Sequence, residues 1–186
     1  MAFRIGRSAL AGLAALALIF VGAMVFLATR NSPRAFEDKG GLLLSSPAFS
    51  NGSALPEKYS CQGEAVSPPL SISGIPAGTK SLTLVVKDPD APIGTFYHLV
   101  AWNIPVAASI AENSSFSGGT VGMNTAGQNK YVGACPPYGT HRYVFQIYAL
   151  DAKLSLPASA GFAELEAAMQ GRVLAQAGLT ALYSKS

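Results

Sequence analysis

The chain has 186 residues and a formal net charge of +3, with 13 lysine and arginine residues against 10 aspartate and glutamate residues. Arg4, Arg7 and Arg30 account for the whole excess, so the rest of the chain is balanced and contains no Lys/Arg cluster. A nucleic-acid-binding protein needs a basic face, so nucleic acid is excluded as a partner. The roughly 155 residues that follow the first 30 suit one ordinary domain with a real core.

Residues 8–29 carry no charged side chain and are long enough to cross a bilayer as a helix. We interpret residues 1–30 as an N-terminal membrane-targeting helix. Its apolar run exceeds that of an ordinary signal peptide and no clean small-x-small cleavage site follows, which favours an uncleaved signal anchor over a cleaved signal peptide. Arginines flank both ends, so the charge rule fixes the orientation only weakly. We expect the domain to lie outside the cytoplasm on a single-pass cell-membrane anchor, or in the periplasm or medium if the leader is cleaved.

Residues 31–41 mix charge, proline and glycine without periodicity and are typical of a linker, so the folded domain should occupy residues 42–186. Runs that alternate or are rich in β-branched and aromatic residues indicate strands separated by turn signals. These runs are 42–44 with Phe49, 70–73, 81–86, 96–104 and 142–150. The Gly/Ser/Asn-rich stretch 113–129 predicts a long loop, which is uncommon in a compact domain unless it forms part of a site such as a pocket wall.

The C-terminal tail is the one part of the domain with a helical pattern. Ser159 can cap a segment in which Phe162, Leu165, Met169 and Val173 recur at three- and four-residue spacing, and Gly178 stands near the expected end. Two glutamates in the first turns favour the same interpretation. We therefore expect a docked amphipathic helix whose apolar stripe covers the sheet.

The chain has two cysteines, Cys61 and Cys135, both beyond the leader. An exported domain would meet an oxidising compartment, where a disulfide between them is one alternative. Two separate thiols are the other, because the sequence gives no distance between the two Cα atoms.

Polar residues gather beside two of the predicted strands. In Asp88-Pro89-Asp90-Ala91-Pro92 the prolines stiffen the chain and set two carboxylates at defined angles. His98 lies ten residues after Asp88, and simple alternation makes it face away from its neighbours Tyr97 and Leu99. A second rigid Pro-Pro-Tyr-Gly turn leads into His141-Arg142-Tyr143, where His141 and Tyr143 share a face. We expect these groups to meet in a small pocket at one end of a sheet.

Three linked motifs resemble the phosphatidylethanolamine-binding protein family, including its bacterial Raf kinase inhibitor-like branch. They are Tyr59-Ser60-Cys61-Gln62-Gly63 with Ser67-Pro68-Pro69-Leu70, Asp88-Pro89-Asp90-Ala91-Pro92 with His98, and Tyr131-Val132-Gly133-Ala134-Cys135-Pro136-Pro137 with Gly139-Thr140-His141-Arg142-Tyr143. The resemblance covers residues 42 to 183 in order. Two positions depart from the family pattern: residues 71–73 lack the tryptophan common in bacterial members, and Gln62 stands where an acidic residue is frequent.

The resemblance implies an all-β-dominated fold, a sandwich of two packed sheets, to which the pattern of the tail adds a C-terminal amphipathic helix. It also implies a small pocket that accepts anions such as phosphate or a phosphorylated head group. Imidazole N–H groups, a tyrosine hydroxyl and backbone N–H groups can donate to phosphate oxygens, and a carboxylate can orient a histidine. Carried over by position, the ligand-binding residues are Asp88, Asp90, His98, Gly133, Pro136, His141 and Tyr143.

The principal hypothesis is a binding module for a small anionic or phosphorylated ligand. The alternative, suggested by the family's names, is an interaction protein that inhibits a kinase or protease through the pocket rim. An enzyme is the third class: the histidines and aspartates could act as acid and base or ligate a metal, and Cys135 is the one candidate nucleophile. Because there is neither a nucleophile elbow nor a phosphate-cradling glycine loop, we predict no catalysis, no cofactor and no metal.

Overall fold

The structure of the protein is a computed structural model that describes residues 41–185. The predicted membrane-targeting segment, residues 1–30, and all but the last residue of the predicted linker lie outside this range. Within it, no helix combines the length and the apolar character that crossing a membrane requires.

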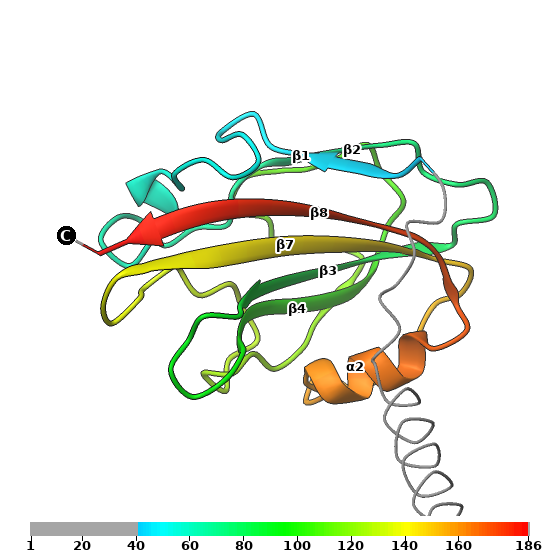
Figure 1. Ribbon diagram of the computed structural model, residues 1–186. Coiled ribbons are helices and arrows are strands. Elements are labelled where there is room, and N and C mark those ends of the chain that lie inside the picture. Colours follow the sequence, from blue (N-terminus) through cyan, green and yellow to red (C-terminus); the bar gives the residue numbers. More distant parts are fainter. Residues whose placement is uncertain (1–40, 186) are drawn as a thin grey trace, which may run out of the picture. The chain divides into compact units, whose positions relative to one another are not determined.

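Two antiparallel sheets pack face to face, and a short helix lies on the outer side of the larger sheet (Figure 1). The strand order is β1-β2-β5 in the smaller sheet and β6-β4-β3-β7-β8 in the larger one. The predicted two-sheet fold with one helix is confirmed. The elements are β1 (Leu43–Ser45), the 3-10 helix η1 (Glu57–Tyr59), β2 (Leu70–Ser73), β3 (Ser81–Asp88), β4 (Phe96–Ile104), β5 (Ser109–Ile110), β6 (Thr120–Val121), β7 (Thr140–Leu150), α2 (Phe162–Met169) and β8 (Val173–Ser184).

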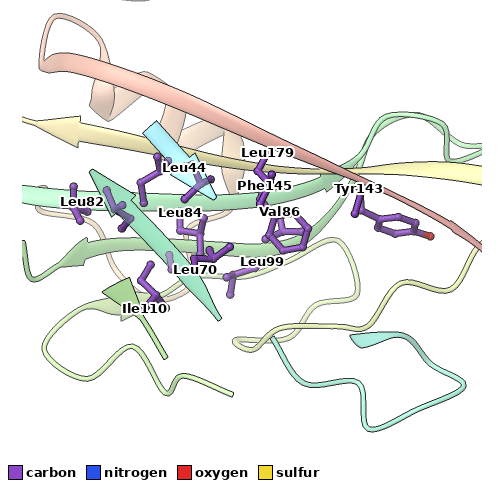
Figure 2. Packing of buried hydrophobic residues seen from close by; sticks show 14 of the residues in the cluster. Leu44, Leu70, Leu82, Leu84, Val86, Leu99, Ile110, Tyr143, Phe145 and Leu179 are labelled. Atoms are coloured by element: carbon purple, nitrogen blue, oxygen red, sulfur yellow. The ribbon is translucent and has the colours of Figure 1, made fainter. Parts of the chain in front are cut away.

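The larger sheet is buried on both faces, which explains why β3 is an almost continuous apolar run. Leu84 and Val86 point toward the smaller sheet, while Val85 between them points toward α2. Burial of both faces removes the need for alternating polar residues. Figure 2 shows the inner core, to which both sheets contribute; it includes Leu44, Leu70, Leu82, Leu84, Val86, Leu99, Ile110, Tyr143, Phe145 and Leu179.

The tail differs from the helical prediction over its second half. Helix α2 ends at Met169, and Gly171 follows with a φ of 73°, a left-handed conformation that glycine adopts without strain and that commonly ends helices. Residues 173–184 then form β8, which pairs along its whole length with β7. Buried residues there recur at every second position from Ala175 to Tyr183, except for half-buried Ala177. Hydrogen bonding to β7 thus overrides the helix preference of alanine and leucine.

The start of α2 also differs from the prediction, because Ser159 does not cap it. Gly161 is the N-cap, and its backbone N–H donates to the Glu164 carboxylate at 3.1 Å. The two-residue strands β5 and β6 were missed, since two residues carry no periodic signal. Strand β6 lies inside the predicted loop 113–129 and pairs with Ala101 and Trp102 of β4.

Gly122 provides a test of packing on the helix side of the sheet. A Cβ at this position would lie 2.2 Å from the ring of fully buried Trp102 and 2.5 Å from the carbonyl oxygen of Ala160. We expect Gly122→Ala to lower the free energy of unfolding by about 1–3 kcal/mol, because buried backbone and a large ring must move. The matched change Gly178→Ala, whose Cβ would meet nothing nearer than 4.0 Å, should be nearly neutral in urea denaturation. Equal losses in the two variants would contradict this description.

Candidate functional site

One end of the larger sheet brings four of the predicted ligand-binding residues together. Asp88 is the last residue of β3, and β3 lies between β4, which carries His98, and β7, which carries His141 and Tyr143. All four are almost completely buried, with 1% to 4% of each residue exposed. We call Asp88, His98, His141 and Tyr143 the Asp–His cluster.

A β-bulge sets the direction of His98. Val86 of β3 is paired with Leu99, but the next residue, Lys87, is paired with Tyr97, so His98 is an extra residue in β4. The predicted alternation is therefore wrong: Tyr97 packs on the α2 side, where its ring stacks on Phe162, while Leu99 belongs to the core between the sheets. The bulge turns the His98 ring toward the inner face.

His98 makes two hydrogen bonds to the backbone of Val132, one through its ring and one through its own carbonyl oxygen. Its Nδ1 lies 2.8 Å from the carbonyl oxygen of Val132, and the N–H of Val132 donates to the carbonyl oxygen of His98 at 3.0 Å. A carbonyl oxygen only accepts, so the proton sits on Nδ1. The ring also meets the edge of the Tyr143 ring, with centroids 5.2 Å apart. Position and tautomer of His98 are thus both fixed.

Burial lowers the pKa of His98 below its ordinary value. The backbone of Val132, the charge of Asp88 and the backbone of Gly133 act in the opposite direction but do not outweigh burial. At neutral pH the ring is therefore neutral, with a hydrogen on Nδ1 and a lone pair on Nε2.

Asp88 joins the second histidine to the cluster. Its Oδ2 lies 2.7 Å from Nδ1 of His141, and its Oδ1 accepts the backbone N–H of Asp90 at 2.8 Å. The second bond closes the stiff Asp-Pro turn onto its own first residue, a common use of aspartate in turns. Asp88 thereby orients His141 with Nδ1 inward, as a carboxylate does in many catalytic and metal-binding histidine pairs.

Asp90 faces a different partner, the guanidinium of Arg142. Its two carboxylate oxygens accept from Nε at 2.9 Å and Nη2 at 2.6 Å, and Oδ2 also accepts the backbone N–H of Arg142 at 2.9 Å. These bonds lower the Asp90 pKa to about 2. Asp90 therefore stands beside the cluster and acts through Arg142, a residue that the sequence motifs contained but the prediction did not assign to the site.

Tyr143 places a hydroxyl in the cluster. The residue is 1% exposed, and its oxygen is sealed from solvent without a hydrogen-bond partner of good geometry among the described residues. Burial, followed by the negative charge of Asp88, raises the pKa of this phenol far above its ordinary range. Tyr143 is therefore a neutral O–H donor at any physiological pH.

Gly133 and Pro136 belong to the segment that lies beside the cluster. Cys61 and Cys135 form a disulfide with their Cα atoms 5.4 Å apart, and the backbone of residue 60 pairs with that of residue 134. Gly133 is packed so closely that a Cβ would lie 2.8 Å from the carbonyl carbon of Ser60. Pro136 is buried immediately after the disulfide. Because Cys135 is bonded, the candidate nucleophile has no free thiol.

A cavity of about 600 Å³ is lined in part by the same segment. Tyr131, Val132, Gly133 and Cys135 line it, together with residues 64–67, 113–116 and 128–130. Gly133 is the only predicted ligand-binding residue on its wall, whereas the Asp–His cluster is not. The predicted loop 113–129 does contribute a wall to this cavity, but the Asp–His cluster does not.

The two histidines leave matching atoms for a ligand. Within residues 41–185, neither Nε2 has a hydrogen-bond partner, and neither is among the polar atoms sealed from solvent. Both Nδ1 atoms are occupied, so each ring can interact with a ligand only through Nε2. In the same range, no three His, Cys, Asp or Glu residues are arranged to hold a metal ion.

Comparison with known proteins gives a consistent result over the folded part of the chain. The family model of the phosphatidylethanolamine-binding protein matches residues 45–184. A UPF0098 protein of Pyrococcus horikoshii is 42% identical over 158 residues, covering 80% of this chain and 79% of the relative. A UPF0098 protein of Chlamydia trachomatis is 43% identical over 148 residues, covering 76% and 98%.

Two crystal structures share the fold. A phosphatidylethanolamine-binding protein homologue from Chlamydia trachomatis has a TM-score of 0.76 at 41% identity, covering 78% of this chain and 99% of that one. YbcL of E. coli, described as a member of the mammalian family of these proteins, has a TM-score of 0.73 at 28% identity with the same coverage.

The state of His98 can be measured directly. In ¹⁵N NMR spectra recorded across a pH series, we expect His98 to carry its proton on Nδ1 when neutral and to titrate with a midpoint below 6.5, because burial disfavours the imidazolium. A folded pKa below the unfolded value means that this group contributes stability above the unfolded pKa and that stability falls as pH drops through the interval between them. A neutral Nε2–H tautomer would contradict the geometry.

The two aspartates should differ in their effect on stability. The side chain of Asp88 is 5% exposed and that of Asp90 is 29% exposed. We expect Asp88→Asn to lower the free energy of unfolding by about 1–3 kcal/mol, because His141 loses a buried charged acceptor. The matched Asp90→Asn should cost less than about 1 kcal/mol, since solvent screens its ion pair. Urea denaturation at neutral pH compares the two, and an equal or reversed order would refute this assignment.

Proposed function

The chain belongs to the phosphatidylethanolamine-binding protein family, and we propose that it binds a small anionic or phosphorylated ligand, of the phosphate or head-group type, at the Asp–His cluster. The observation that carries the proposal is the pairing of two histidines whose Nδ1 atoms are bound by the protein and whose Nε2 atoms are left for a ligand. Family membership supports ligand binding in general, and the geometry of the cluster supports the anionic class.

Several donors can serve an anion at this position. The Tyr143 hydroxyl is neutral and has no hydrogen-bond partner of good geometry among the described residues. His98 offers a charge-assisted N–H once its Nε2 is protonated, and such bonds to phosphate oxygens are strong. The arrangement thus provides hydrogen-bond donors together with a way to acquire positive charge.

The two carboxylates do not oppose an anion as strongly as their number implies. Asp90 is compensated by Arg142 through two side-chain bonds, and Asp88 is hydrogen-bonded to His141. His98, by contrast, is neutral in the free protein because of burial. Binding of an anion should therefore be accompanied by uptake of a proton at Nε2 of His98, since the bound charge favours the imidazolium.

The proposal places the domain outside the cytoplasm, either tethered to the membrane through residues 1–30 or released from it. The disulfide between Cys61 and Cys135 supports an oxidising compartment. Inhibition of a kinase or protease stays a prediction, because nothing within residues 41–185 singles out such a partner.

Isothermal titration of the full-length chain with inorganic phosphate and with phosphoethanolamine tests the proposal. We expect affinity to fall as pH rises from about 5 to about 8, because the proton on His98 must then be taken from a more alkaline solution. The heat of binding should also change with the ionisation enthalpy of the buffer. A flat affinity profile over this range would overturn the proposal.

Variants identify the residue responsible. His98→Gln keeps a donor for the Val132 carbonyl oxygen but cannot become charged, so we expect affinity to fall about tenfold and the pH dependence to weaken. Lys153→Ala, an exposed change in the segment before α2, is the control and should leave both unchanged. If the two variants behaved alike, the cluster would not be the binding site.

A further inference from the structure

We propose that the cavity beside Tyr131–Cys135 is a second ligand site, which takes an uncharged polyhydroxylated molecule of the size of a mono- or disaccharide. This site is separate from the Asp–His cluster, and the proposal does not depend on anion binding there. The volume of about 600 Å³ lies within the range of small-molecule sites.

One polar side chain of the cavity wall is buried and yet uncommitted. Ser67 is 6% exposed and lines the cavity, and its hydroxyl has no hydrogen-bond partner among the described residues although it is not sealed from solvent. A buried hydroxyl normally has a partner, so this one is available to a ligand. Five further lining residues are exposed and have polar side chains that bond to no described residue, so they can exchange water for a ligand: Glu64, Asn113, Ser115, Gln128 and Lys130.

The cavity is also where the backbone is least relaxed. Four residues other than glycine have a positive φ in the described part of the chain, and three of them line this cavity: Ala65 at 55°, Asn113 at 51° and Phe116 at 54°. Such conformations are costly for side chains with a Cβ and gather at ligand sites. The N–H of Asn113 donates to the carbonyl oxygen of Ser67 at 2.9 Å, which ties two of the walls together.

The chemistry of the wall favours a neutral ligand with many hydroxyl groups. Glu64 and Lys130 contribute one charge of each sign, so the cavity has no net preference for an ion. Amide and hydroxyl groups both donate and accept, as sugar hydroxyls do. Val66, Val121, Tyr131 and Val132 provide apolar surface suited to the C–H faces of a sugar ring. A fatty chain would leave the buried hydroxyl of Ser67 without a partner, which is costly.

The wall shared with the Asp–His cluster makes binding detectable at a distance. Val132 lines the cavity. Its carbonyl oxygen accepts a hydrogen bond from the His98 ring, and its N–H group donates to the His98 carbonyl oxygen. A ligand in the cavity should therefore shift the NMR signals of the amides of Val132 and Gly133 and of the His98 ring. The two sites are joined by one backbone segment.

The test uses the purified full-length chain, free of glycerol and glycoside detergents, with a panel of glucose, N-acetylglucosamine, maltose and trehalose. In NMR experiments that saturate the protein signals, we expect saturation to be transferred to at least one of these sugars, with a dissociation constant of the order of 1 mM or below. Asn113→Gly keeps the left-handed backbone but removes the amide, and Gln128→Ala removes the other. Each should weaken binding about fivefold, the loss expected for one hydrogen bond.

A blocking pair provides the control. Ser115→Trp fills the cavity from its exposed wall and should abolish saturation transfer, whereas Ser117→Trp, two residues along the same loop and not on the wall, should bind like the original chain. Thermal unfolding establishes that both variants are folded. The proposal is overturned if no sugar of the panel shows transfer at 10-fold the expected constant (about 10 mM), or if Ser115→Trp binds as well as Ser117→Trp. Phosphate titration of the same samples reports on the Asp–His cluster separately.

Discussion

The reciprocal pair of hydrogen bonds between His98 and Val132 is the contact on which both candidate sites of this protein depend. It joins the extra residue of β4 to a segment that belongs to neither sheet. On the sheet side, the pair fixes the tautomer and direction of His98 within the Asp–His cluster. The same segment, held by the Cys61–Cys135 disulfide, also forms a wall of the cavity of about 600 Å³.

The sheet provides a rigid support for this contact. Its central strand β3 is hydrogen-bonded on both sides and buried on both faces, against the smaller sheet and against α2. Cores packed at such density do not yield gradually to small displacements. The carboxylate of Asp88 therefore leaves the end of β3 at a fixed point, and the stiff Asp-Pro turn holds it there with an internal hydrogen bond. Polar groups positioned by a rigid scaffold are what selective binding requires.

The electrostatics of the site follow from unequal burial of similar groups. Asp90 is partly exposed and pairs with Arg142, so its charge is balanced before any ligand arrives. Asp88 is buried and pairs with a histidine, and the remaining histidine is kept neutral by its own burial. Under the proposed function, the cluster would gain a proton together with an anion, a coupling that an exposed arrangement of the same residues would lack.

Local pattern in the sequence was sufficient for most of the long strands, but not for β8, and for the residues of the Asp–His cluster. Side-chain periodicity and turn residues act over a few positions, so they predict the strands around 70–73, 81–88, 96–104 and 140–150. Three features were decided only in three dimensions. Strand β8 exists because β7 offers it a hydrogen-bonding partner, His98 faces inward because a bulge adds a residue to β4, and Asp90 is drawn away by Arg142. In each case the deciding partner lies at least twenty residues away in the sequence, or the outcome depends on the register of strand pairing. A local sequence pattern encodes neither the distant partner nor the register.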